Sequence, residues 1–122
     1  MNAVCDECGP SDVLEWGRGS EKDPNAPAYY LASLLGGRVC EHKDLGHLAS
    51  PITHVRPDAP PFLILHGEKD DLVYPSQSER LHQALIRTGA TSTLKIFSKI
   101  GHGIDAMAAA PLVDAYFDRH LM

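Results

Sequence analysis

Two short segments of the chain carry side chains whose types and spacing suit acid–base chemistry. The first is His66-Gly67-Glu68-Lys69-Asp70, which directly follows an apolar run, and the second is Gly101-His102-Gly103, which follows a predicted strand. Reacting groups collect at the carboxyl ends of parallel strands, which meet at one edge of a sheet. Asp70 and His102 would therefore lie together, in the chain order acid then base of a nucleophile–base–acid triad.

The stretches before these segments predict the strands of a parallel α/β sheet. Phe62–Leu65 is an unbroken apolar run bounded by Pro60-Pro61 and Gly67, as expected for a strand buried on both faces. In residues 91–97, Leu94 and Ile96 alternate with polar side chains, which is typical of a strand with one buried face. We predict an α/β fold with a short, mainly parallel sheet of about three strands, flanked by helices.

Two helices are expected to cover this sheet. Ser76 to Glu79 has the pattern of a capping box, which predicts a helix to about Thr88 with its stop at Gly89. Pro111 is expected to open the last helix, whose sheet-facing side chains would be Val113, Phe117 and Leu121. The alternation of strand and helix predicts right-handed βαβ connections.

The ordered set of motifs resembles the C-terminal part of an α/β-hydrolase of the esterase/lipase type. The likeness rests on HGEKDDLVYPSQSERLHQAL and IFSKIGHG, with Cys8–Asp12, Leu34–Gly37 and Ala49–Val55 in the family's order. Within the superfamily the chain is most similar to feruloyl-esterase-like and prolyl-oligopeptidase-like enzymes. The resemblance implies that Asp70 is the triad acid, that His102 is the triad base, and that the parent enzyme acts on a small-molecule ester.

The same resemblance exposes a missing part. The sequence contains no G-x-S-x-G and no HGGG-like oxyanion motif, both of which family members carry N-terminal to the matching region. We therefore expect a carboxylic-ester hydrolase segment that is inactive alone, since losing the serine of a triad can cost on the order of 10⁶ in turnover. Two alternatives stay open: a non-catalytic dimeric module that binds a small ligand, and a segment of a prolyl-oligopeptidase-type serine peptidase.

Residues 13–58 are expected to form a cap-like helical excursion from a single domain that spans residues 1–122. Trp16 is a candidate anchor, and Ser11 or Asp12 could cap a short helical turn. A helix is predicted from Pro27 to Gly36-Gly37, with an apolar stripe of Tyr30, Leu31, Leu34 and Leu35. A second short helix is predicted over 41–48, and Ser50 after it is interpreted as a turn-forming hydroxyl.

Composition narrows the classes of partner and ligand. The net charge of −5 argues against nucleic acid or an anionic membrane as the main partner. Three cysteines leave an odd thiol, which is typical of a reducing compartment, so we expect a cytoplasmic protein. Cys5 and Cys8 with Cys40-Glu41-His42 could be read as zinc ligands, but strand geometry would point Cys5 and Cys8 to opposite faces. We expect free thiols and no cofactor or metal.

The first strand, near Val4, is expected to lie at an open edge of the sheet. In the family this strand pairs with the one that leads into the nucleophile, and that strand is not found in this sequence. Open sheet edges promote association. We therefore expect a homo-oligomer, in which two copies pair edge to edge about a two-fold axis.

Overall fold

A computed structural model describes residues 2–121, without the side chain of Ala106. Three parallel strands form one sheet in the order β1-β2-β3, so β2 is central and β1 lies at an edge. This confirms the predicted fold class. The elements in chain order are β1 (Val4–Glu7), α1 (Val13–Trp16), α2 (Pro27–Leu35), η1 (Val39–Glu41), α3 (Lys43–Ala49), η2 (Pro51–His54), β2 (Phe62–Gly67), α4 (Ser76–Thr88), β3 (Ser92–Phe97) and α5 (Ala106–Leu121).

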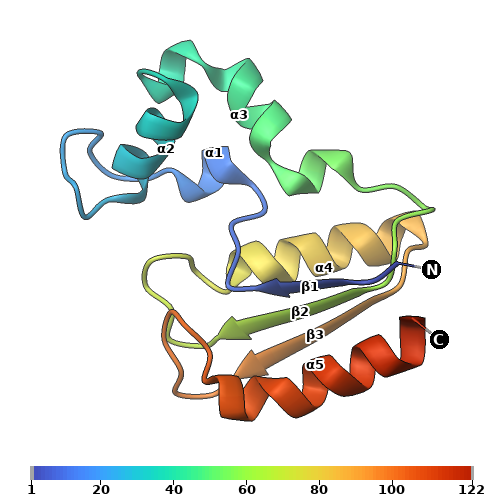
Figure 1. Ribbon diagram of the computed structural model, residues 1–122. Helices are drawn as coiled ribbons and strands as arrows, with labels where there is room; N and C mark the ends of the chain where they lie inside the picture. Colours follow the sequence, from blue (N-terminus) through green and yellow to red (C-terminus); the bar gives the residue numbers. More distant parts are fainter. Residues whose placement is uncertain (1, 122) are drawn as a thin grey trace.

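Helices cover both faces of the sheet, because successive side chains of β2 point to opposite sides. Ile64 packs against Leu81 and Leu85 of α4, while Leu63 and Leu65 pack against α5. Figure 1 shows the sheet between α4 and α5, with the three strand ends pointing to the same side. Since β2 is buried on both faces, its continuous apolar run was a reliable signal.

The helical segment 13–54 forms a separate layer beside the carboxyl end of β1 (Figure 1). It has its own apolar cluster, which is built on Val13, Trp16, Leu31 and Leu35 and includes Val73 from the loop after β2. The predicted stripe on α2 is half wrong, because Tyr30 and Leu34 are 47% and 65% exposed. Leu31 and Leu35 face inward, since residues four apart share one face of a helix.

The helix predicted from Ser76 to about Thr88, with its stop at Gly89, is confirmed, but its predicted cap and the predicted start of the last helix are wrong. Pro75 occupies the N-cap of α4 and no side chain caps that helix, so Ser76 to Glu79 is not a capping box. The last helix begins at Ala106, and Pro111 lies inside it. A proline is tolerated best in the first turn, where no intrahelical partner is lost, and this preference suggested too late a start. Ala109 and Tyr116 supply the buried contacts of α5, whereas Leu121 is exposed.

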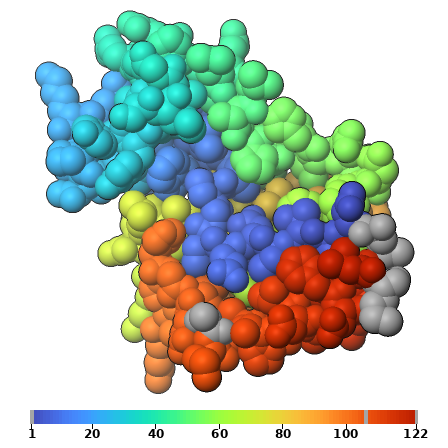
Figure 2. Space-filling model, in the orientation of Figure 1, coloured from blue at the N-terminus to red at the C-terminus, as the bar shows by residue number. Residues whose placement is uncertain are grey.

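The structure also fixes which parts of the edge strand are unpaired. Val4 N donates to Pro61 O and Cys8 N donates to Leu65 O, so alternate residues of β1 bond to β2. Cys5 and Glu7 lie between these positions and direct their backbone groups away from the sheet. Figure 2 shows the N-terminal residues, in blue, at the surface between the helical segment and α5. Among residues 2–121, no helix has the length and apolar character needed to cross a bilayer.

Candidate active site

Asp70 sits in the loop after β2, with its carboxylate held on both oxygens. Oδ1 accepts hydrogen bonds from the backbone N–H groups of Leu72 (3.0 Å) and Val73 (2.9 Å). Oδ2 faces two imidazoles, those of His102 and His66. The side chain is buried, and the groups that its oxygens meet can all donate a hydrogen bond. The loop therefore presents one fixed carboxylate at the carboxyl edge of the sheet.

His102 comes from the loop after β3 and meets this carboxylate directly. Its Nδ1 lies 2.8 Å from Asp70 Oδ2, so an Nδ1–H group donates to the carboxylate. The imidazole is 42% exposed, and its Nε2 forms no hydrogen bond with any residue from 2 to 121. Sequence reasoning placed Asp70 and His102 at one edge, and the structure brings them into contact. An imidazole oriented in this way keeps an open nitrogen that can accept a proton.

Backbone hydrogen bonds tie the two loops together. Glu68 N donates to Phe97 O (2.9 Å), and Lys69 N donates to Ile100 O (2.8 Å). These bonds extend the contact past the end of β2, first to the last residue of β3 and then to the loop after it. The distance between Asp70 and His102 is therefore set by sheet-like pairing, which is more rigid than a contact between two independent loops.

His66 is a part of the site that sequence reasoning missed. It is fully buried, its Nε2 lies 2.7 Å from Val73 O and 3.2 Å from Asp70 Oδ2, and its Nδ1 lies 2.6 Å from Ser78 Oγ. An Nε2–H that donates to Val73 O, with the Ser78 hydroxyl donating to Nδ1, satisfies the neutral ring. The alternation of side chains along β2 could have predicted this position, because it puts His66 on the same face as Ile64, toward α4.

The other candidate residues lie outside the contact between Asp70 and His102. Asp71 and Glu68 are exposed, and Glu68 accepts a hydrogen bond from Lys99 N (3.2 Å). Ser50 is buried, where its hydroxyl donates to Gly46 O (2.8 Å) and accepts from Val13 N (2.9 Å). The hydroxyl of Ser50 is thus used, as donor and as acceptor, in holding α1 to α3, a structural role that is broader than the turn-forming one expected.

The helical segment also holds the Asp70 loop from its outer side. The indole Nε1–H of Trp16 donates to Leu72 O (2.9 Å), and the guanidinium of Arg18 lies 4.0 Å from the centre of the Tyr74 ring. The predicted anchoring role of Trp16 is confirmed. The loop is therefore fixed between the sheet on one side and α1 on the other.

A buried glutamine joins the helical segment to α4. Gln77 Oε1 accepts from the backbone N–H groups of Ser11 (2.9 Å) and Asp12 (2.8 Å), and its Nε2 donates to Glu15. Asp12, one of the two possible caps, caps α1 by accepting from Glu15 N and also pairs with Arg80. This network sets the position of α1 relative to the sheet.

Two titratable groups of β1 have shifted pKa values. Burial raises the pKa of Asp6, an effect that a hydrogen bond from the Gly9 backbone and the nearby His66 partly oppose. Burial, together with the negative charges of Glu7 and Asp6, raises the pKa of the Cys5 thiol to about 11. Burial is the largest cause of both pKa shifts, and neighbouring acids contribute only to that of Cys5.

The three thiols are free, but they are not equally buried. Cys8 is buried, Cys5 is partly buried and Cys40 is exposed. Cys40 and His42 form no group of three or more possible metal ligands with Cys5 and Cys8 within residues 2–121, so the CxxC-based zinc alternative does not assemble. The group that does assemble in this part of the chain is Cys8, His66 and Asp70.

A cavity of about 250 Å³ between η2 and α4 includes Phe62, at the opposite end of β2 from Asp70.

Comparison with proteins of known sequence gives both esterase and peptidase relatives. Residues 1–85 match the BD-FAE family. The chain is 41% identical to esterase LipQ of Mycobacterium tuberculosis over 59 residues, which is 48% of this chain and 14% of LipQ. It is 33% identical to the uncharacterized peptidase YuxL of Bacillus subtilis over 79 residues, which is 59% of this chain and 12% of YuxL.

The solved structures that resemble this chain also include both an esterase and a peptidase. A truncated form of a carbohydrate esterase from gut microbiota superposes on 98% of this chain with a TM-score of 0.79 and 30% identity. A puromycin-hydrolyzing peptidase of Mycobacterium tuberculosis covers 95% of it with a TM-score of 0.77 and 27% identity. The matched region is 43% of the first protein's chain and 17% of the second's. This chain therefore spans less than half the length of each of these relatives.

The family match covers more than two thirds of the chain, and the fold agrees with it. The chain belongs to the BD-FAE family and has the fold of the C-terminal part of an α/β-hydrolase.

Proposed function

We propose that this chain is the acid–base segment of a carboxylic-ester hydrolase, in which Asp70 and His102 serve a serine that lies outside this sequence. The observation that supports the proposal most directly is the 2.8 Å contact between Asp70 Oδ2 and His102 Nδ1. It leaves Nε2 of a half-exposed imidazole open at the carboxyl edge of the sheet. The esterase relatives support a carboxylic ester as the substrate class.

In this proposal His102 moves the proton and Asp70 holds His102. Nε2 takes the proton of the serine hydroxyl during attack on the ester carbonyl and then returns it to the leaving alkoxide. Asp70 fixes the tautomer that has its proton on Nδ1 and stabilises the imidazolium as it forms, without accepting the proton itself. His66 takes no part in this proton transfer, because both of its nitrogens already form hydrogen bonds inside the protein.

The unpaired edge of β1 supports a segment that is completed by another part of the enzyme. Cys5 and Glu7 offer backbone groups to a further strand, next to the carboxyl edge that holds Asp70 and His102. A serine presented from such a strand would approach Nε2 from the open side. Without it the acid–base pair has no nucleophile to activate, so the isolated chain should be close to inert toward esters.

The peptidase relatives favour a second candidate. YuxL is similar to this chain in sequence, and the puromycin-hydrolyzing peptidase is similar to it in fold. Peptide and ester hydrolysis use the same proton transfers. In that case Asp70 and His102 keep their roles, and the leaving group is an amine.

A chimera tests the proposed roles in a complete enzyme. The region of the gut carbohydrate esterase that superposes on this chain would be replaced by residues 1–122, and hydrolysis of p-nitrophenyl acetate would be measured. His102→Ala should abolish the rate, Asp70→Asn should lower kcat about 10⁴-fold, and the exposed neighbour Asp71→Asn should leave it unchanged. A folded chimera that keeps its rate in the His102→Ala variant would refute the proposal.

The isolated chain supplies a second test that does not depend on the chimera. Nitrogen-15 spectra of the imidazoles should show that His102 carries its proton on Nδ1. The proton signal of this Nδ1–H group should lie at low field because of the hydrogen bond to Asp70, and Asp70→Asn should remove that low-field shift. The tautomer with the proton on Nε2 would contradict the proposal. A substantial rate with p-nitrophenyl acetate that disappears in His102→Ala would show that the chain is not inert alone.

A further inference from the structure

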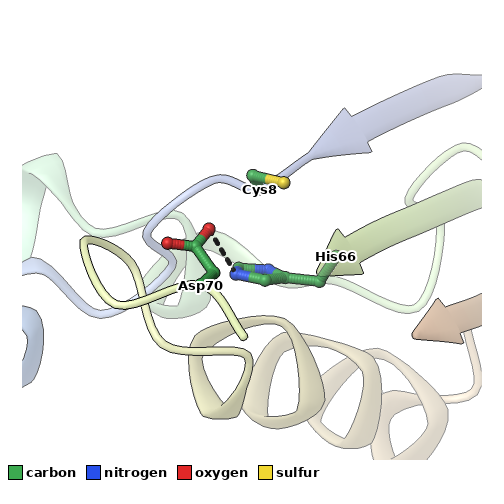
Figure 3. Close-up of side chains that lie close together, drawn as sticks. All are labelled: Cys8, His66 and Asp70. Atoms are coloured by element: carbon green, nitrogen blue, oxygen red, sulfur yellow. Dashed lines mark ion pairs between the residues drawn. The ribbon is translucent and has the colours of Figure 1, made fainter. Parts of the chain in front are cut away.

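Three potential metal ligands from three different segments meet inside the protein. Cys8 follows β1, His66 lies near the end of β2, and Asp70 lies in the loop beyond it, and Figure 3 shows the three side chains together. One ligand atom from each lies within 4.8 Å of the other two. All three residues are buried, with exposed fractions of 6%, 0% and 2%. Solvated acidic clusters are common, whereas this thiol, imidazole and carboxylate are buried together and shielded from water.

The chemistry of these ligands selects a class of cation. Thiolate and imidazole are preferred by zinc and its relatives, while calcium and magnesium prefer oxygen ligands alone. One thiolate and one carboxylate balance a divalent cation, so the occupied site is neutral, as a buried site requires. We propose that Cys8, His66 and Asp70 form a binding site for a zinc-like divalent cation.

The spacing of the ligands is close to what such a cation needs. Zinc bonds of about 2.0–2.3 Å in a tetrahedron place ligand atoms about 3.3–3.8 Å apart. His66 Nε2 and Asp70 Oδ2 are already 3.2 Å apart, and a ligand atom of Cys8 that starts within 4.8 Å of the others needs to approach by at most about 1.0–1.5 Å. The carbonyl oxygen of Val73, now hydrogen-bonded to Nε2 at 2.7 Å, would have to move away from Nε2 by about 0.6–1.1 Å to serve as a fourth ligand.

The surroundings of His66 supply the support that a metal-bound imidazole requires. Ligating histidines almost always hydrogen-bond through their second ring nitrogen, which fixes the ring orientation. Nδ1 of His66 lies 2.6 Å from Ser78 Oγ, on the first turn of α4. Ser78 is itself fully buried, so this hydrogen bond is shielded from water.

Binding changes the protonation of two groups and involves no electron transfer. The Cys8 thiol releases its proton to solvent and bonds to the cation as a thiolate. The imidazole proton of His66 leaves Nε2 and is replaced by one on Nδ1, which then donates to Ser78 Oγ instead of accepting from it. One proton is released for each cation bound, so binding strengthens as the pH rises.

Occupancy of this site would act on the acid–base pair, because the two share an atom. Asp70 Oδ2 is both the ligand atom nearest to His66 and the acceptor for His102 Nδ1. A cation that draws charge from this oxygen weakens its hydrogen bond to His102. The binding itself is independent of the proposed function, whereas a consequent inhibition of catalysis rests on it.

Cobalt(II) titration of the full chain under reducing conditions tests the site, since cobalt replaces zinc and reports thiolate ligation by a charge-transfer band. The band, together with the visible absorption of a four-coordinate ion, should appear in the native chain. Cys8→Ser should abolish it, while Cys5→Ser and Cys40→Ser should retain it. Ser78→Ala should weaken cobalt affinity about 10- to 100-fold.

Thermal unfolding keeps the test decisive if Cys8→Ser folds poorly. Zinc should raise the Tm of the native chain and of Cys40→Ser, because a ligand that binds the folded state stabilises it. A native chain without a thiolate band, or a band that survives Cys8→Ser and is lost in Cys40→Ser, would overturn the proposal. A band that depends on Cys8 while the low-field His102 Nδ1–H signal stays in place would overturn the coupling to Asp70 and leave the proposed function untouched.

Discussion

Gly67 and Gly101 lie in backbone contact, at the point where the His102 loop crosses the end of β2. A Cβ atom at Gly67 would overlap the carbonyl oxygens of Gly101 and Ile100 and would lie 2.9 Å from the carbonyl carbon of Ile100. Since these obstacles are backbone atoms, no side-chain rotation can relieve the clash. This close approach lets Lys69 N reach Ile100 O and so brings His102 over Asp70.

Gly67→Ala should therefore destabilise the protein and separate His102 from Asp70. We expect a loss of about 1–3 kcal/mol in the free energy of unfolding, as for other substitutions that overpack a rigid site. Urea denaturation and the His102 Nδ1–H signal give the two measurements. Gly101→Ala is the matched control, because its Cβ would meet only Lys69 O at 3.8 Å and should change stability by less than about 0.5 kcal/mol. Equal effects of the two substitutions would contradict the role given to Gly67.

Trp16→Phe should loosen the Asp70 loop while keeping the apolar contact of the ring. It removes the hydrogen bond from Nε1 to Leu72 O, and we expect a cost of about 1 kcal/mol. The backbone N–H groups of Leu72 and Val73 donate to Asp70 Oδ1. Their hydrogen exchange should be faster in the variant than in the native chain, and the increase should exceed any increase in β2. Unchanged exchange at these two amides would show that the helical segment does not hold the loop.

Asp6→Asn should stabilise the protein at neutral pH. Burial raises the pKa of Asp6 in the folded state above its ordinary value of 3.8, so the unfolded chain releases this proton more easily. The resulting loss of stability appears as the pH rises from about 3.8 through the folded pKa, and it persists at neutral pH. Urea denaturation of both proteins should show the advantage of the Asp6→Asn variant shrinking on acidification. An advantage that grew toward low pH would contradict this sign.

Cys5 should resist alkylation where Cys40 does not. The pKa of Cys5 is raised to about 11 from 9.0, so its thiolate fraction at pH 8 falls about 100-fold. Cys40 is exposed and should react first with iodoacetamide, as peptide mass spectrometry would show. The rate at Cys5 should keep rising up to about pH 11. Equal rates at the two positions at pH 8 would be inconsistent with a desolvated Cys5.

Self-association through the β1 edge can be tested without breaking the sheet. The inward hydrogen bonds of β1 come from residues that alternate with Glu7, so Glu7→Pro removes an outward N–H and keeps the pairing with β2. We expect dimers of the native chain in light scattering and monomers of Glu7→Pro, with Glu7→Ala as the control. A native chain that is monomeric at high concentration would rule out this mode of association.

The sequence by itself determined the parallel sheet and the pair at its edge. Phe62–Leu65 is apolar on every residue because β2 is covered on both faces, and a short run of this kind is typical of the central strand of a parallel sheet. Asp70 and His102 could be brought together because each follows a strand, and parallel strands end at the same edge. The start of the last helix was less predictable, because Pro111 lies inside α5 although prolines are most common in a first turn.

Only the tertiary structure decided what surrounds that pair. His66 and Ser78 are twelve positions apart and become partners because α4 lies across one face of β2. Trp16 reaches Leu72, and Cys8 reaches His66 and Asp70, through contacts between segments more than fifty residues apart. Local patterns of hydrophobicity specify which residues are buried. They do not specify which buried polar side chains meet, because that depends on how the layers pack.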